Sequence, residues 1–306
     1  MIKTRKQFFN HLRYKIFVVL SLFILIQCTS ESPKAIHLLE KKKLETQSDT
    51  TAVKIPLLPQ VNYHLISTKD SNDWLMSLPP GDTLQALLVL NRIDRKSLLK
   101  LDTLVFPDTV GVGIALYSPF PKNVAELSTI HKILFISYYA QAFAVYENGS
   151  RIKWGPASLG KQATPTPTGL FSTNWKSKRT ISTVNKSWVM DWYFNIANFQ
   201  GVSMHQYALP GYPASHACIR LYNEDAYWLY NWADEWILDQ SNILVYGTPV
   251  VIFGKYPFDQ RKPWLLQSEN NIALTITTSE LIAVTQEFLP AIMERQAKRD
   301  SVEFHL

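Results

Sequence analysis

The residue types best suited to chemistry lie in one short segment of the chain, Ser215–Arg220, with the sequence SHACIR. The segment contains the thiol of Cys218, the imidazole of His216 and the guanidinium of Arg220. A second imidazole, His205, lies thirteen residues before the cysteine. A thiol becomes a good nucleophile only when a nearby base or cation favours its thiolate. A guanidinium beside it can bind a carboxylate through two hydrogen bonds. The segment therefore predicts an activated sulfur nucleophile next to an anion-binding group.

The spacing of these residues predicts how they meet. His216 lies two residues before Cys218, so in an extended segment both side chains would point to one face of a strand. His205 ends a predicted strand over 201–205, and the PGYP sequence at 210–213 must turn. The two segments can then return side by side, with Cys218 within hydrogen-bond distance of one imidazole. Successive backbone N–H groups of His216, Ala217 and Cys218 could form an oxyanion hole.

Three other interpretations of the cluster are less favoured. Two histidines and a cysteine can bind zinc, but the spacing H-x10-H-x-C matches no common zinc pattern. A papain-like protease places its histidine well after its cysteine, whereas both histidines precede Cys218. A structural thiol is expected on an apolar stripe, whereas several neighbours of Cys218 are polar.

The first 27 residues predict export. Five basic residues and no acidic one precede an apolar run over 16–26, which is too short for a stable membrane-spanning helix of about 20 residues. The run leads to the sequence LIQC, which ends at Cys28 and resembles a bacterial lipoprotein signal, in which that cysteine becomes the lipidated N-terminus. Gln27 departs from the Gly, Ala or Ser that usually precedes it. An ordinary cleaved signal and an uncleaved N-terminal anchor are the alternatives.

The predicted export signal changes how the net charge and the two cysteines are interpreted. The chain has 31 basic and 25 acidic residues, but residues 1–27 hold five of the basic ones, which leaves 26 against 25. The composition therefore gives no indication of nucleic-acid binding. An oxidising compartment normally uses cysteines in pairs. With Cys28 lipidated, Cys218 has no partner within the chain and becomes a candidate reactive thiol.

The regions flanking the site differ in composition. Residues 28–60 are polar and flanked by prolines, which is typical of a tether. Residues 61–110 predict a strand, two helices and a strand (61–67, 70–78, 82–90 and 98–106). This small β-α-α-β unit resembles a LysM module, a peptidoglycan-binding fold, although a generic packing unit fits the pattern equally well. Residues 255–306 predict a C-terminal helical extension with a helix over 277–297 that Pro290 interrupts, either packed on the catalytic region or contacting a partner.

The region 128–254 is predicted to be mainly β. Apolar, aromatic and β-branched runs at 133–138 and 142–146 are strand signals, and Glu147-Asn148-Gly149 predicts a hairpin turn after the second run. Helical periodicity is found mainly over 225–236, and a last strand is expected at 247–253. Many short strands with one helix predict a β-sandwich or barrel with a capping helix.

Several motifs of this region together resemble the L,D-transpeptidase catalytic domain of the YkuD type. They are His205, PGYP at 210–213, SHACIRL at 215–221, DA at 225–226 and GTPV at 247–250, with VYENG at 145–149 and the Thr/Pro-rich segment 160–169 in the first half. The similarity covers about residues 130–254, and the cysteine motif is its most specific part.

The resemblance implies an activity and a role for each site residue. Cys218 would attack the peptide bond before the terminal D-residue of a peptidoglycan stem tetrapeptide, release D-alanine and form an acyl-enzyme. An amine of a second stem would then take the acyl group and give a 3→3 cross-link, without a cofactor. His205 would be the general base, Ser215 and His216 would shape the site, and Arg220 would orient the substrate or brace the loop.

Two positions depart from the family pattern. The family usually has glycine where this chain has Ala217, and commonly glycine where it has Gln206. Ala217 keeps its N–H group, but a positive φ there would be strained because of its Cβ.

Two alternatives to the transpeptidase remain. The same acyl-enzyme given to water would make an L,D-carboxypeptidase or endopeptidase. A non-catalytic, lipid-anchored peptidoglycan-binding protein would be expected to have lost Cys218, His205 or Arg220, and all three are present. The sequence thus predicts a protein of the cell envelope or periplasm, anchored to a membrane, whose partners are peptidoglycan stem peptides.

Overall fold

A computed structural model describes residues 61–303 of the chain. The predicted export signal, the lipidation site Cys28 and the tether lie outside the described residues. The described residues all fall within one unit of the chain, which begins at Leu58.

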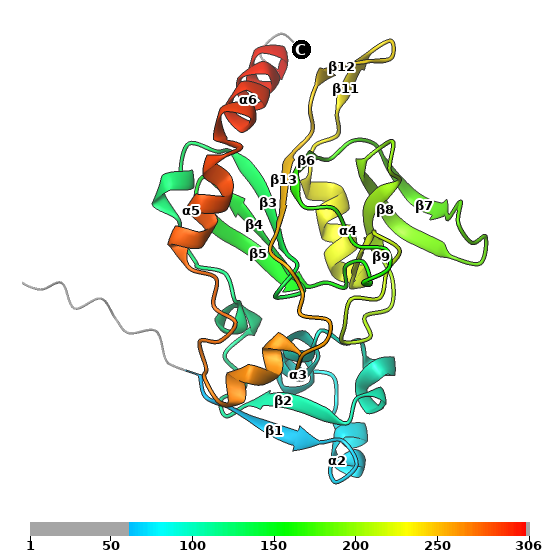
Figure 1. Cartoon of the computed structure of the whole chain (residues 1–306), viewed down its shortest axis with the longest axis vertical. Coiled ribbons are helices and arrows are strands. Elements are labelled where there is room, and N and C mark those ends of the chain that lie inside the picture. The colour runs from blue at the N-terminus through cyan, green and yellow to red at the C-terminus, as the bar shows by residue number, and fades with distance from the viewer. Residues whose placement is uncertain (1–60, 304–306) are drawn as a thin grey trace, which may run out of the picture. The chain divides into compact units, whose positions relative to one another are not determined.

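A five-stranded sheet forms the centre of this unit (Figure 1). Its strand order is β5-β4-β3-β13-β6, and only the β3–β13 pair is parallel. The strands are β3 (Lys132–Ser137), β4 (Ala142–Glu147), β5 (Ser150–Pro156), β6 (Gly169–Ser172) and β13 (Pro249–Phe253). The predicted hairpin turn is confirmed between β4 and β5, where Asn148 and Gly149 have φ of +47° and +77°. Two successive positive φ values are what a type I′ turn requires.

The five-stranded sheet is covered on both faces because its strands are apolar on both sides. In β3, Ile133 and Phe135 join one buried cluster, while Leu134 and Ile136 join the other. Helices α5 (Thr278–Gln286) and α6 (Leu289–Glu303) contribute to the first cluster, and α4 (Asn223–Trp232) contributes to the second. Figure 1 shows α5 and α4 on opposite sides of this sheet.

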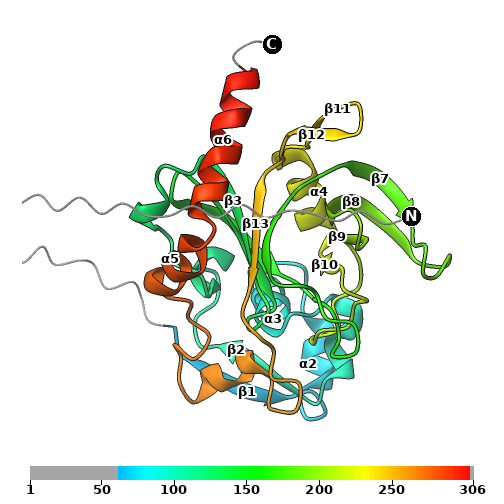
Figure 2. The ribbon, with the colours of Figure 1, turned by 45° about the horizontal axis from the view of Figure 1, so that its top comes forward.

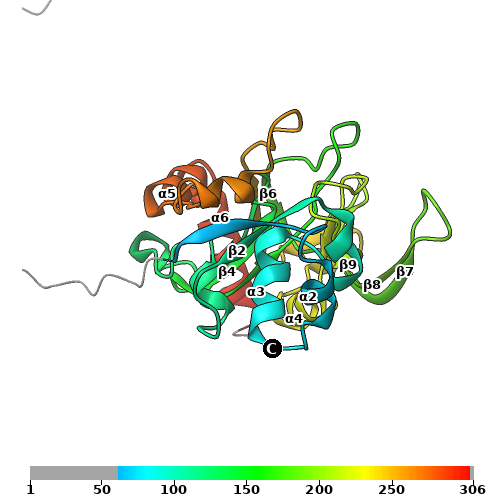
Figure 3. The same ribbon diagram turned by 90° about the horizontal axis from the view of Figure 1, so that it is seen from below.

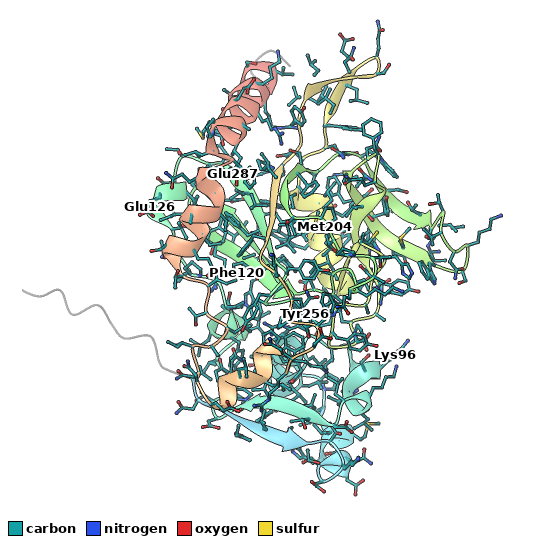
Figure 4. The ribbon with its side chains drawn as sticks, in the orientation of Figure 1. Lys96, Phe120, Glu126, Met204, Tyr256 and Glu287 are labelled. Carbon is teal, nitrogen blue, oxygen red and sulfur yellow. The ribbon has the colours of Figure 1, made fainter. Side chains whose placement is uncertain are left out.

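A four-stranded sheet lies across the second cluster and carries the candidate site (Figure 2). Its order is β10-β9-β8-β7, with β7 (Lys176–Ile181), β8 (Val189–Ala197), β9 (Val202–Gln206) and β10 (Ile219–Leu221). Met204 of β9 is fully buried between the sheets (Figure 4). A two-stranded ribbon, β11 (Ile237–Asp239) and β12 (Asn242–Val245), precedes β13. The mainly β sandwich with a capping helix is thus confirmed.

The N-terminal region has the predicted strand–helix–helix–strand order (Figure 3). Its elements are β1 (Tyr63–Ser67), α2 (Asn72–Ser77), α3 (Asp82–Asn91) and β2 (Thr103–Pro107), with β1 antiparallel to β2. The second strand is shorter than predicted because Arg95–Lys100 form a 3-10 helix, which Asp94 caps. The assignment of this region to the LysM class stays a prediction.

The C-terminal region consists of two helices where the sequence predicts one interrupted helix. The chain leaves α5 after Gln286 and begins α6 at Leu289, which places Pro290 in the first turn of α6, where a missing N–H costs nothing. Between residues 61 and 303, no helix combines the length and the apolar character needed to cross a membrane.

Candidate active site

The predicted site residues meet in a cleft of ≈ 470 Å³. His205, Ser215, His216, Cys218 and Arg220 all line it. The opposite wall is formed by β7, β8 and the residues that flank them, and it includes four aromatic side chains: Trp175, Trp188, Tyr193 and Phe199.

Strands β9 and β10 bring the cysteine and the buried histidine to the same cleft. The two strands lie side by side, as the sequence predicts for these segments. Their pairing is parallel, with Met204 opposite Ile219 and His205 opposite Arg220. Cys218 lies directly before β10 and is partly exposed.

The sulfur of Cys218 has two hydrogen-bond partners. Ser203 Oγ donates to Sγ at 3.4 Å, and the carbonyl oxygen of Gly201 lies 3.7 Å from Sγ, where it accepts the thiol proton. Among the described residues, neither imidazole is hydrogen-bonded to the sulfur, contrary to the expected contact. Catalytic hydrogen bonds often shorten only when substrate binds. The structure therefore places His205 in the cleft of the cysteine without a direct bond to it.

His205 is held in the neutral form that a general base needs. Its Nδ1 lies 2.9 Å from the carbonyl oxygen of Gln206. A carbonyl can only accept, so Nδ1 carries the proton and Nε2 keeps its lone pair. Burial lowers the pKa of His205 to about 4, against the opposing effect of the Gln206 bond and with a further lowering by the charge of Arg220.

The backbone turns sharply between His216 and Cys218, because Ala217 has φ of +73°. The expectation of an extended segment with both side chains on one strand face is therefore wrong. Both still line the cleft, and the exposed His216 ring lies 4.8 Å from the ring of Trp188. Partial desolvation, together with the charges of Lys161 and Arg220, lowers the pKa of His216.

Hydroxyl groups hold the carbonyl groups of this turn. Thr164 Oγ1 donates to the carbonyl of Ser215 at 3.2 Å, and Thr166 Oγ1 donates to that of Ala217 at 2.9 Å. The hydroxyl of Ser215 donates to the carbonyl of Cys218. Three carbonyl groups of the turn are therefore fixed by side chains that do not contact the sulfur.

The N–H groups of the same turn are left free for an oxyanion. Within residues 61–303, the N–H groups of His216, Ala217 and Cys218 donate to no protein acceptor. Free backbone donors beside a nucleophile are what stabilises the developing negative charge of a tetrahedral intermediate. The predicted oxyanion donors thus have the hydrogen-bonding state that this role requires.

Arg220 is fixed in place but keeps its charge available. Its guanidinium lies 4.7 Å from the ring centre of Tyr207, and its backbone exchanges two hydrogen bonds with Ser158 at 3.0 Å. It forms no ion pair with any carboxylate in the described part of the chain. Burial lowers the pKa of Arg220, while Tyr207 and Cys218 act in the opposite direction. The guanidinium is suited to bind an anionic substrate group.

Residues 131–252 match the family model described as YkuD, the L,D-transpeptidase catalytic domain. The chain carries a YkuD domain. The matched segment extends from the start of β3 into β13 and includes every residue of the cleft.

Part of this chain is similar to solved L,D-transpeptidases. The enzyme of Stackebrandtia nassauensis is 24% identical over 42% of this chain and 58% of its own, with a TM-score of 0.35. L,D-transpeptidase 1 of Mycobacterium tuberculosis is 24% identical over 40% of this chain and 62% of its own, with a TM-score of 0.32. The enzyme of Mycobacterium smegmatis is 16% identical over 64% of this chain and 92% of its own, with a TM-score of 0.33. The match thus spans less than two thirds of the first two of these proteins. No curated protein matches the chain.

Three residues that contact the sulfur of Cys218 or the turn before it were not assigned a role from the sequence. Ser203 lies two residues before His205 on β9 and so shares its face, which is the signal that could have identified it. Thr164 and Thr166 belong to the Thr/Pro-rich segment, but the sequence does not show which carbonyl groups they bind. No three His, Cys, Asp or Glu side chains in residues 61–303 are grouped as metal ligands, so the zinc interpretation gains no support there.

Proposed function

We propose that this protein is a peptidoglycan L,D-transpeptidase that forms 3→3 cross-links through an acyl-enzyme on Cys218. The observation that carries the proposal is the turn at His216–Cys218. Its carbonyl groups at Ala217 and Cys218 accept hydrogen bonds from side chains, while its N–H groups donate to no acceptor among residues 61–303. The neutral imidazole of His205 and the guanidinium of Arg220 line the same cleft.

Acylation begins at the sulfur. Cys218 Sγ attacks the carbonyl carbon before the terminal D-residue of a stem tetrapeptide, and His205 Nε2 takes the thiol proton. The oxygen of the tetrahedral intermediate binds the N–H groups of the turn. The C–N bond then breaks, His205 gives its proton to the leaving amine, and D-alanine departs from a thioester on Cys218.

Transfer reverses these proton movements. An amine of a second stem attacks the thioester carbonyl, a new C–N bond forms and the C–S bond breaks. His205 takes a proton from the attacking amine, and the sulfur leaves as a thiolate that is reprotonated. Because burial holds the pKa of His205 near 4, the imidazole is neutral and able to accept a proton at pH 7 in both steps.

The cleft suits a peptide that carries carboxylates. Its volume of ≈ 470 Å³ lies within the usual range of ligand pockets, about 300–1,000 Å³. Arg220 can bind a carboxylate with two hydrogen bonds, and the aromatic wall opposite can cover the apolar parts of the stem.

The test is incubation of the purified protein with disaccharide-tetrapeptide, followed by mass spectrometry of protein and products. We expect an acyl adduct on Cys218 and a dimer formed with loss of D-alanine. Cys218→Ala should give no adduct, whereas Cys28→Ala, which changes the other cysteine, should leave the adduct unchanged. A tripeptide without dimer would instead support an L,D-carboxypeptidase, and the absence of any adduct on Cys218 would contradict both activities.

Export and anchoring are proposed from residues 1–28 alone. We propose that the signal is cleaved before Cys28 and that lipid on this cysteine holds the domain at a membrane of the cell envelope. The mature protein should then have the mass of residues 28–306 plus lipid and should be recovered with membranes. Recovery of Cys28→Ala with membranes, as for the wild type, would contradict the lipid anchor.

A further inference from the structure

A loop joins β9 to β10. His205 lies near the end of β9, just before the loop, and Ser215 lies at the end of the loop, before β10. Residues 207–214 of this loop form neither helix nor strand. The relative position of the base and the nucleophile therefore depends on what holds the loop. On one side, the residues that hold the loop come from the N-terminal region, more than a hundred residues earlier in the chain.

Residues 92–94, directly after α3, pair with residues 209–211 of the loop. Asp94 N donates to the carbonyl of Leu209 at 2.9 Å, and Gly211 N donates to that of Arg92 at 3.0 Å. Ile93 and Pro210 form an antiparallel bridge between these two bonds. The loop is thus attached by a short backbone ladder.

The carboxylate of Asp94 adds a charged contact to this ladder. Its Oδ2 accepts a hydrogen bond from Leu209 N at 3.0 Å, and its Oδ1 accepts one from Ser97 N at 2.9 Å. The Ser97 bond caps the 3-10 helix over 95–100 and fixes the orientation of the carboxylate. One side chain therefore links the frame of the N-terminal region to the loop.

The contact is closely packed. Ile93 and Leu209 are both fully buried. Gly211 has φ of +81°, and a Cβ there would lie 2.8 Å from Ile93 Cγ2 and 2.8 Å from Leu101 Cδ1. On the other side of the loop, Ser158 Oγ donates to the carbonyl of Tyr212 at 2.8 Å. The loop is therefore hydrogen-bonded on two sides and packed closely against the N-terminal region.

We propose that Asp94 is a positioning residue of the acyl-transfer site. By accepting the N–H of Leu209, it fixes the loop whose ends place His205 and Ser215, and through Ser215 the turn at Cys218. The inference rests on the proposed transpeptidase function. It makes the β-α-α-β region a part of the catalytic frame, whatever else that region binds.

The substitution Asp94→Asn tests the contact selectively. The asparagine oxygen can keep the cap on Ser97 N, because asparagine is as good an N-cap as aspartate. Its NH2 group then faces the N–H of Leu209, donor against donor. Asp102→Asn is the matched control, since Asp102 lies in the same region and its carboxylate is 91% exposed, 4.0 Å from Lys69, with no hydrogen bond to the described residues.

Two readouts are followed, hydrogen exchange and single-turnover acylation. In Asp94→Asn, exchange protection at Leu209 and Gly211 should fall about tenfold or more, as expected for loss of a hydrogen bond to a charged group, while β3 and β4 keep theirs. The acylation rate constant of Cys218 should fall about tenfold to a hundredfold with complete amplitude, because a small misplacement of reacting groups is costly. Asp102→Asn should match the wild type in both.

Other outcomes overturn the proposal. A wild-type rate constant in Asp94→Asn, with complete or reduced amplitude, would show that Asp94 affects at most the folded fraction. If the wild-type protein does not acylate at all, the proposed function has failed, and alkylation of Cys218 by iodoacetamide then decides the positioning role. An alkylation rate changed in Asp94→Asn alone supports the role, and equal rates in all three proteins overturn it.

Discussion

Ala217 occupies a backbone conformation that favours glycine. Its φ of +73° lies in the left-handed region, which costs an L-residue roughly 1–2 kcal/mol. The turn nevertheless holds this conformation because Thr166 binds the carbonyl of Ala217 and Ser215 binds that of Cys218. The Cβ is small enough to pack against the cluster between the sheets. The alanine at this position is therefore accommodated by the hydroxyl groups around the turn.

Substitutions at Ala217 should separate side-chain size from backbone strain. Ala217→Gly should acylate at least as fast as the wild type and change the free energy of unfolding by less than about 1 kcal/mol, because relief of strain is offset by the entropy of glycine. Ala217→Val should lower the free energy of unfolding by about 2 kcal/mol or more and should also abolish acylation. Urea denaturation and single-turnover acylation measure both effects. A valine variant that acylates normally would contradict the assignment of the turn.

The buried imidazole of His205 is neutral in the folded protein, and this makes the free energy of unfolding depend on pH. Its folded pKa of about 4 lies below the unfolded value of about 6.5. As the pH falls through this interval, the unfolded chain takes up the proton first, so the free energy of unfolding decreases. The same low pKa keeps the imidazole neutral well below pH 6.

The His205→Gln substitution should remove this part of the acid sensitivity. Between pH 7 and pH 4.5 we expect the wild type to lose about 2 kcal/mol more of its free energy of unfolding than His205→Gln. Urea denaturation of the two proteins at both pH values measures the difference. Equal losses would mean that the imidazole of His205 is not held neutral by burial.

At the scale of elements, local signals were predicted and long-range pairing was not. The Asn148-Gly149 turn and the helix break before Pro290 depend on residues adjacent in the sequence, so their chemistry is readable there. The insertion of β13 between β3 and β6 has no local signal, because strands buried on both faces carry no distinguishing pattern.

The sequence predicted the residues of only one wall of the cleft. The sequence identified the segment from His205 to Arg220, whose residue types are chemically distinctive. The opposite wall, β7 and β8, was not identified, since β7 has the polar sequence KSKRTI and is at most half-buried. The turn at Ala217 was also missed, because the hydroxyl groups that enforce it come from residues about fifty positions earlier.

The segment 160–169 should act on the site through Thr166. This side chain is 2% exposed, accepts from Gly160 N at 2.8 Å and donates to the carbonyl of Ala217 at 2.9 Å. Thr166→Val leaves both backbone groups unpaired, so we expect a loss of about 3 kcal/mol in the free energy of unfolding and slower acylation.

Two controls accompany Thr166→Val. Thr166→Ser keeps the hydroxyl and should retain most of the acylation rate. Thr168→Val makes the same change at an exposed neighbour whose hydroxyl forms no hydrogen bond with the described residues, and it should have little effect. If Thr166→Val and Thr166→Ser acylate equally fast, the hydroxyl does not hold the turn.

At the scale of the whole described unit, three regions of the chain share one core. Val89 of α3, Phe135 of β3 and Leu281 of α5 belong to the same buried cluster as Trp264. The fully buried guanidinium of Arg92 donates to the carbonyl of Ala140 at 2.9 Å and lies 5.5 Å from the ring centre of Trp264. Burial lowers the pKa of Arg92 to about 10, so it remains charged at pH 7. The N- and C-terminal regions are therefore structural parts of the catalytic unit.

Trp264 is the residue through which this shared core can be tested. It is the largest fully buried side chain of the described residues and belongs to the region after the YkuD match. Trp264→Ala should lower the free energy of unfolding by about 4 kcal/mol. Because the core is shared, hydrogen exchange should rise together in α3 and in β3 and β4. Trp74→Ala, at a side chain that is 43% exposed, should cost much less. Loss of protection in the C-terminal helices alone, with α3 and the sheet unchanged, would show that the regions fold independently.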